Sequence, residues 1–143
     1  YYCEHGTPEL VWRSEWQSHA NGVTSMPEFV AVANDADSEV AQFATLLDTE
    51  VEMDGNGVRC VTLDGCQVTV LTPDQYLDRY GELASTMGSR NAIFGAMVFA
   101  TKGLSMLHDL LDDLDGVVID RHPGRTIVRV DAFDAVLEFV GIR

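Results

Sequence analysis

The sequence predicts an α+β domain in which two βαβββ modules form one curled mixed sheet. The order strand, helix and three strands occurs over residues 27–72 and again over residues 92–142. Short apolar runs or alternating apolar residues mark the strands, and an apolar face at helical spacing marks each helix. The two stretches align at a nearly constant offset, which indicates an internal structural repeat.

The first module begins with an apolar run at residues 29–33, which is typical of a buried strand. Asp35 can cap the helix that follows, and Val40 lies on the apolar face of that helix. Asp64 and Gly65 form a strong hairpin signal, because both can adopt a positive φ. The pattern therefore predicts three further strands, at residues 51–53, 60–63 and 68–71.

A short helix is expected at residues 73–80. Thr72 can cap it, Pro73 fits its first turn, and Gln75 completes a capping box. Gly81 marks its end, because glycine readily adopts the backbone conformations that stop a helix. This helix is expected to join the two modules.

The second module begins with the apolar run at residues 93–100. Thr101 can cap a helix whose apolar face carries Leu104, Leu107 and Leu111. The remaining strands of this module are predicted at residues 117–119, 126–130 and 136–139.

The repeat also predicts where a ligand would bind. It places Phe29 near Phe94 or Gly95, and Thr69 on Glu138. Each module covers one face of its sheet with a helix, so the other face needs a partner. Two modules side by side can curl their sheets into a half-open barrel, and its concave face forms a cleft of the kind that small-molecule sites favour.

The first 23 residues differ from the rest of the chain. They contain both tryptophans, Trp12 and Trp16, and no clear period runs through them. Such residues can cover a pocket, but they more often anchor an arm to a core or to a dimer face. We therefore interpret residues 1–23 as an arm or linker that packs against the body.

The charge of the chain argues against two classes of partner. The net charge is −14, with 23 acidic and 9 basic residues. Such a surface repels phosphate backbones and anionic lipids, so we expect neither nucleic acid nor membrane as a partner. The acidic excess favours solubility, and adaptation to high salt is the alternative.

Cysteine usage and the missing leader predict a cytoplasmic protein. Cys3, Cys60 and Cys66 form neither a paired framework nor a CxxC motif, which suits free thiols in a reducing compartment. No charged and then apolar leader opens the chain. The longest apolar run, at residues 93–100, is too short to span a bilayer.

The order of elements and the closing strand at residues 136–140 resemble the vicinal oxygen chelate superfamily. Its members include glyoxalases, extradiol dioxygenases, epimerases and antibiotic-binding resistance proteins. The arm sequence at residues 4–13, with Glu15-Trp16 and residues 19–22, resembles the segment between two such domains in larger glyoxalase-like proteins.

This resemblance implies the glyoxalase/bleomycin resistance/dihydroxybiphenyl dioxygenase fold. It also implies that residues 24–143 are the C-terminal domain of a larger glyoxalase-like protein. Residues 1–23 would then be an arm from an upstream unit, and residues 1–5 would be the last strand of that unit.

The resemblance further implies where metal ligands would lie. In metal-using members they come from the first and fourth strands of each module and point into the cleft. The first strand here offers Glu28 and the eighth offers Glu138, whereas the fourth offers Thr69, or Gln67 in a shifted register. The fifth strand offers no ligand, because neither aligned residue can bind an ion. The candidate metal site is therefore Glu28, Thr69 and Glu138, and it lacks a histidine.

Glu138 is also the candidate catalytic residue. It lies between Leu137 and Phe139 in an apolar strand. If it faces the cleft, burial would raise its pKa and suit it to act as a general base. Simple alternation leaves the other possibility open, in which Val136, Glu138 and Val140 share an outward face.

Two functions remain open from the sequence. The first is an enzyme of lyase, isomerase or dioxygenase type that acts on a small oxygenated substrate, with a divalent metal. The second is a small-molecule-binding or structural domain without a metal, and the missing fifth-strand ligand favours this one. A homodimer is a further expectation, because such barrels bury sheet edges by pairing.

Overall fold

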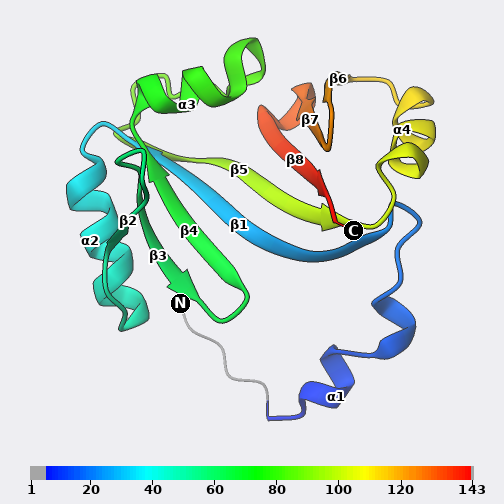
Figure 1. Cartoon of the computed structure of the whole chain (residues 1–143), viewed down its shortest axis with the longest axis horizontal. Helices are drawn as coiled ribbons and strands as arrows, with labels where there is room; N and C mark the ends of the chain where they lie inside the picture. Colours follow the sequence, from blue (N-terminus) through cyan, green and yellow to red (C-terminus); the bar gives the residue numbers. More distant parts are fainter. Residues whose placement is uncertain (1–5, 143) are drawn as a thin grey trace.

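The computed structural model describes residues 6–142, whose strands form one eight-stranded mixed sheet in the order β2-β3-β4-β1-β5-β8-β7-β6. Figure 1 shows the sheet curled around a concave side, with β1 (Val23–Ala33) and β5 (Ala92–Thr101) along its middle. These two strands pair antiparallel and join the halves of the sheet. The α+β class with two modules and a curled mixed sheet is thereby confirmed.

Each half of the sheet repeats one βαβββ order. In the first half β1 pairs parallel with β4, and in the second half β5 pairs parallel with β8. The other elements of the first half are α2 (Ala36–Leu47), β2 (Glu52–Met53), β3 (Arg59–Leu63) and β4 (Cys66–Leu71). Those of the second half are α4 (Leu104–Asp112), β6 (Val117–His122), β7 (Arg125–Val130) and β8 (Ala135–Gly141).

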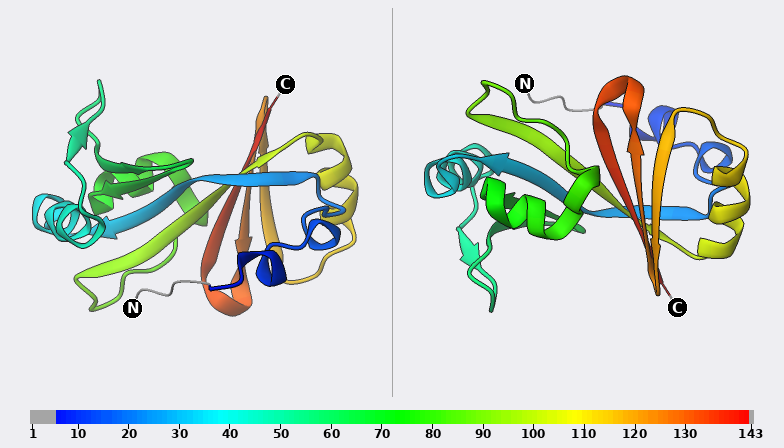
Figure 2. Two further views of the ribbon diagram at one scale, coloured as in Figure 1. Left: turned by 90° about the horizontal axis from the view of Figure 1, so that it is seen from below. Right: turned by 90° about the horizontal axis from the view of Figure 1, so that it is seen from above.

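Helices cover both sides of the sheet, as Figures 1 and 2 show. On the outer side α2 packs on the first half and α4 packs on the second half. On the concave side lies α3 (Pro73–Tyr80), the helix that joins the modules. It packs on the apolar residues that point inward from both halves: Val30, Val32, Leu71, Ile93, Ala96, Val98, Ile127 and Val136.

The predicted starts of α2 and α3 are confirmed. The Asp35 carboxylate accepts a hydrogen bond from the Ser38 N–H at 3.0 Å. At α3 the full capping box forms, since Thr72 accepts from the Gln75 N–H and the Gln75 side chain accepts from the Thr72 N–H. Gly81 ends α3 with a φ of 55°. These caps fix α3 directly after β4 and above the cleft.

The prediction that Thr101 caps the fourth helix is wrong. Thr101 is the last residue of β5, where it pairs with Val23 on one side and Gly141 on the other. Its hydroxyl donates to the Asn21 carbonyl at 2.9 Å. The N-cap is Gly103, which offers no side-chain cap. Sheet pairing on both edges therefore extends the strand past the point where the sequence suggested a helix start.

The internal alignment of the modules also needs a correction. In the first half Val30 lies opposite Thr69, and in the second half Val98 lies opposite Glu138. Because Thr69 and Glu138 correspond, Val30 corresponds to Val98.

By the same count Phe29 corresponds to Met97, and not to Phe94 or Gly95 as the sequence suggested. The pairing of β1 with β5 is irregular at Gly95, where the register shifts. One offset therefore does not fit the whole module.

Before β1 the chain forms two short helical turns, α1 (Pro8–Val11) and η1 (Ser14–Trp16). Trp12 and Trp16 remain 66% and 57% exposed, so neither is deeply anchored in the core. The strand expected at residues 1–5 lies outside the described residues. The origin of this arm in an upstream unit stays a prediction.

In residues 6–142 no helix is long and apolar enough to cross a membrane. Cys60 and Cys66 are free thiols, whereas Cys3 lies outside the described residues. The cytoplasmic location and the homodimer stay predictions.

Candidate functional site

Two carboxylates from different modules lie on the concave face of the sheet. Glu28 comes from β1, and Glu138 comes from β8. Glu138 is only 3% exposed and faces inward, since its contacts are with α3 and with the inner face of β7. The alternation that left its direction open is thus resolved by the register of β8 with β5 and β7.

A single arginine of α3 binds both carboxylates. The Arg79 guanidinium donates from Nη1 to Glu28 Oε1 at 2.8 Å and from Nη2 to Glu28 Oε2 at 2.7 Å. The same Nη2 donates to Glu138 Oε2 at 3.0 Å. The pair with Glu28 is bidentate, which is the strong and directional form of this interaction.

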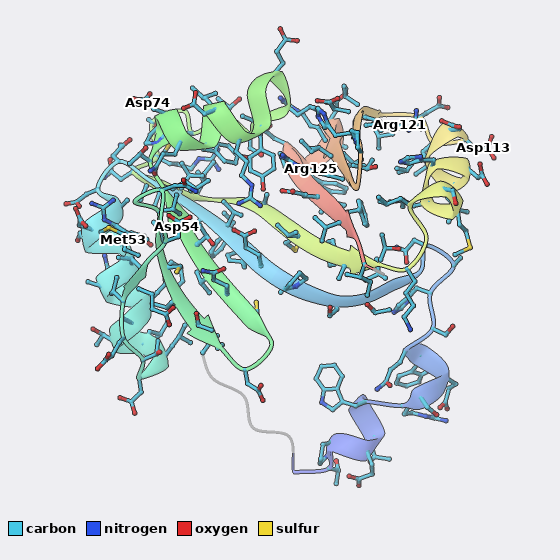
Figure 3. The ribbon with its side chains drawn as sticks, viewed as in Figure 1. Met53, Asp54, Asp74, Asp113, Arg121 and Arg125 are labelled. Carbon is cyan, nitrogen blue, oxygen red and sulfur yellow. The ribbon has the colours of Figure 1, made fainter. Side chains whose placement is uncertain are left out.

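Glu138 has two more partners. The Tyr80 hydroxyl donates to Glu138 Oε2 at 2.8 Å. Arg125 Nε lies 2.8 Å from Glu138 Oε1, in a close ion pair whose N–H is not aligned as a hydrogen bond. Figure 3 shows Arg125 in the space between α3 and the β7–β8 part of the sheet. Glu138 is therefore surrounded by donors.

Tyr76, the other tyrosine of α3, holds the helix against β5. The Tyr76 hydroxyl donates to the Gly95 carbonyl at 2.7 Å and accepts from the Ser85 N–H at 3.1 Å. A Cβ on Gly95 would come within 2.7 Å of Val32 Cγ2 and 2.9 Å of the Tyr76 ring. Only glycine allows this close approach, so the sequence of β5 is adapted to the packing of α3.

Because α3 lies across the concave side, it divides the cleft in two. We call the space between α3 and β6–β7 the wider half-cleft; its volume is about 800 Å³, and its walls include Val118, Ile127 and Arg129. We call the space between α3 and β3–β4 the narrower half-cleft; it measures about 490 Å³ and includes Val58 and Gln67.

The electrostatics of the site favour a charged Glu28. Burial raises the pKa of Glu28, but hydrogen bonds from Arg79 and Thr69 and the charges of Arg79 and Arg125 outweigh it. The pKa of Glu28 therefore lies below its ordinary value of 4.5. Glu28 is a carboxylate at neutral pH and a weak base.

The two α3 groups keep their protons more firmly than usual. Burial is the largest cause that raises the pKa of Tyr80, and the adjacent Glu138 raises it further, although Arg79 opposes them. For Arg79, burial lowers the pKa, but the hydrogen bond to Glu28 and the nearby negative charges raise it above the ordinary value. Tyr80 thus stays a neutral donor, and Arg79 stays a cation.

Scans for related proteins found similarity only at the level of structure. No protein-family model matches the chain, and no curated protein matches its sequence. Methylmalonyl-CoA epimerase from Mycobacterium tuberculosis superposes with a TM-score of 0.55 at 16% identity, covering 87% of this chain and 96% of the epimerase.

Two other solved structures superpose on this chain to a similar extent. A hypothetical protein from Bacillus halodurans superposes with a TM-score of 0.56 at 11% identity, covering 83% of this chain and 94% of that protein. A halotolerant catechol dioxygenase superposes with a TM-score of 0.57 at 14% identity, covering 85% of this chain and 40% of the dioxygenase. The chain has the vicinal oxygen chelate fold. The resemblance to this glyoxalase-like superfamily is confirmed at the level of the fold.

The positions that the vicinal oxygen chelate fold assigns to metal ligands do not fit an ion here. They carry Glu28, Thr69, Ala96 and Glu138, because Ala96 corresponds to Glu28 in the second module. The Arg79 guanidinium already binds both carboxylates. Among the described residues, no three His, Cys, Asp or Glu side chains are grouped as an ion would require. Arg79 and Arg125 together balance the charges of the two carboxylates, so little electrostatic attraction remains for a divalent ion.

Sequence reasoning found the carboxylates but missed their partners. Arg79, Tyr80 and Arg125 contact Glu138, yet none belongs to a strand that the fold uses for ligands. One signal was present, because Tyr76 and Tyr80 are four residues apart and must share a face of the capped helix. A helix with two tyrosines and an arginine on neighbouring positions is more than a connection between modules.

Proposed function

We propose that this vicinal oxygen chelate domain binds a small neutral or singly charged organic molecule in its wider half-cleft, and that it uses no resident metal. The observation that carries this proposal is the Arg79 guanidinium between Glu28 and Glu138. It supports the metal-free alternative over lyase, isomerase or dioxygenase chemistry, which needs an ion or a free base at that place.

The carboxylates also lack the properties of a general base. The pKa of Glu28 is lowered, so it has little tendency to take up a proton at neutral pH. Glu138 is buried and accepts from Tyr80 and Arg79, with Arg125 beside it. A base must reach the proton of a substrate, and these partners occupy the oxygens that would do so.

The wider half-cleft has the size and lining of a small-molecule site. Its volume of about 800 Å³ lies within the range of roughly 300–1,000 Å³ that is usual for such sites. Val118 and Ile127 both line it, since Ile127 packs with α3 and Val118 lies on β6 opposite Arg129, two residues along β7 from Ile127. His122 and Arg129 supply polar groups at the edges.

Charge around this half-cleft argues against a polyanionic ligand. Asp78, Glu82, Asp120 and Asp131 line it. Its arginines are all in ion pairs, for example Arg129 with Asp134 at 2.9 Å. The Streptomyces coelicolor methylmalonyl-CoA epimerase was solved with 2-nitronate-propionyl-CoA. A CoA ester carries several phosphate charges, which the acidic lining here and the net charge of −14 would repel.

Two-dimensional NMR with a panel of small alcohols, amides, amines, monocarboxylic acids and propionyl-CoA tests this proposal. We expect a neutral or singly charged compound to shift amide signals of β6 and β7, and propionyl-CoA to shift none. Val118→Trp fills the wider half-cleft and should abolish the shifts. Val58→Trp makes the same change in the narrower half-cleft and should preserve them.

The proposal fails if Val58→Trp removes binding while Val118→Trp keeps it, because the ligand would then occupy the other half-cleft. It also fails if propionyl-CoA binds better than every singly charged compound, or if no compound of the panel perturbs β6 and β7.

A further inference from the structure

A side chain of the protein, the Arg79 guanidinium, supplies the positive charge between the two modules. Glu28 and Glu138 belong to different modules, yet both lie within 3.0 Å of the same nitrogen, Arg79 Nη2. Their side chains are 19% and 4% exposed, so neither charge is well hydrated. Two carboxylates so close together in a poorly hydrated place require a cation, or one of them must become protonated.

The guanidinium is held rigidly in this place. It lies over the Tyr80 ring, with the guanidinium carbon 5.2 Å from the ring centroid. The Arg79 carbonyl accepts from Arg125 Nη2 at 3.0 Å, which ties the end of α3 to β7. Tyr76 ties the start of α3 to β5 through the Gly95 carbonyl. The helix is thus fastened at Tyr76 and at Arg79, and the Arg79 guanidinium can leave the carboxylates only by giving up its three hydrogen bonds and its contact with the Tyr80 ring.

We infer that Arg79 is an internal replacement for a divalent cation, and that its removal converts the Glu28–Glu138 pair into a metal site. The Thr69 side chain lines the same half-cleft as Glu28 and offers a third oxygen there. Oxygen ligands of this kind suit hard divalent ions such as Mn²⁺. The inference does not depend on which ligand the wider half-cleft binds.

The test compares Mn²⁺ binding by the wild-type chain, Arg79→Ala and Arg121→Ala. Arg121 is the matched control, because it forms an exposed ion pair with Asp112 of α4 and contacts neither Glu28 nor Glu138, and because its loss changes the net charge equally. We expect Arg79→Ala to bind Mn²⁺ with one-to-one stoichiometry by calorimetry. At about 100 times the Kd, Mn²⁺ should raise its Tm by roughly 5–10 °C. The wild type and Arg121→Ala should show neither effect.

A second carboxylate substitution locates the ion. Glu28→Gln in the Arg79→Ala background should abolish stoichiometric binding, because one charged ligand is lost. If Arg79→Ala fails to fold alone, refolding it with and without Mn²⁺ gives the same information, since a bound ion stabilises only the folded state. Arg79→Met, which keeps the length of the side chain, provides a second variant.

Three outcomes overturn the inference. The first is stoichiometric Mn²⁺ binding by the wild type, which would mean that Arg79 does not exclude the ion. The second is a folded Arg79→Ala or Arg79→Met that binds no more Mn²⁺ than Arg121→Ala. The third is binding that survives Glu28→Gln, because the ion would then lie elsewhere.

Discussion

The two modules repeat one order of elements but do not repeat one chemistry. The first module carries its inner carboxylate on its first strand, as Glu28, and the second module carries Ala96 there. On the fourth strand the situation reverses, with Thr69 in the first module and Glu138 in the second. Each module therefore supplies one of two carboxylates, and Arg79 of the connecting helix binds both. A repeated backbone fixes where side chains converge, whereas the unrepeated helix decides what they do there.

The two carboxylates also differ in their exposure and in the number of partners that each one has. Glu28 has one arginine partner and a side chain that is 19% exposed. The Glu138 side chain is 4% exposed and contacts Arg79, Arg125 and Tyr80, which come from two different elements. The second-module carboxylate should therefore matter more for the assembly of α3 on the sheet.

The largest expected effect is on Glu138. Glu138→Gln should lower the free energy of unfolding by about 3–5 kcal/mol, because Arg79 loses one partner and Arg125 loses its carboxylate in a buried place. Glu28→Gln should cost clearly less, since Arg79 keeps Glu138 and water reaches the site. Urea denaturation followed by circular dichroism measures both.

Equal losses in these two variants would contradict the comparison. A double variant sharpens it, because Glu138→Gln combined with Arg79→Met removes both charges of that pair. The combined loss should be smaller than the sum of the single losses, as expected for side chains that contact each other.

The fold of both modules was predictable because it depends on local patterns. Apolar runs of strand length and apolar faces at helical spacing located the strands and the helices α2 and α4, and start and stop signals located α3. The capping box of Thr72 and Gln75 was read correctly, since its residues are three apart and interact wherever the helix packs. Thr101 was misread because its pairing partners, Val23 and Gly141, are distant in sequence.

The candidate site was predictable only in part, for the same reason. Glu138 stood out as a carboxylate in an apolar strand, and the family resemblance pointed to Glu28 on the first strand. Their partner Arg79 is 51 and 59 residues away in sequence, and no local pattern links these positions. The position of Arg79 between the two carboxylates depends on how α3 lies across the cleft, which follows from tertiary packing.

A smaller loss of stability is expected at low pH, and it distinguishes Glu28 in the cleft from carboxylates on the surface. The folded chain depresses the pKa of Glu28, so its contribution to stability is complete above the ordinary value of 4.5 and is lost as the pH falls through the lower folded value. The Tm of the wild type should therefore fall below about pH 4.5. Glu28→Gln should show a shallower fall.

Asp54 provides the control for this pH dependence. Its pKa is also lowered, by hydrogen bonds from the Val58 and Asn56 N–H groups in an exposed turn. Asp54→Asn should leave most of the acid dependence in place, because that carboxylate is fully hydrated and carries no buried partner. The assignment to the site is wrong if Asp54→Asn flattens the profile more than Glu28→Gln does.

The smallest effects concern the outer helices, where the modules differ again. Asp35 caps α2 with its side chain, whereas Gly103 begins α4 without a side-chain cap. Asp35→Ala should cost about 1 kcal/mol, and Gly103→Ser should gain roughly a few tenths of a kcal/mol, because serine can accept from the first turn of α4. Gly103 has a φ of −150°, and a Cβ there would approach no described atom closer than 3.4 Å, so serine fits without strain. Thermal denaturation of both variants measures the difference. A loss in Gly103→Ser would mean that Thr101, whose hydroxyl accepts from the Gly103 N–H at 3.3 Å, already satisfies this end of the helix from within the strand.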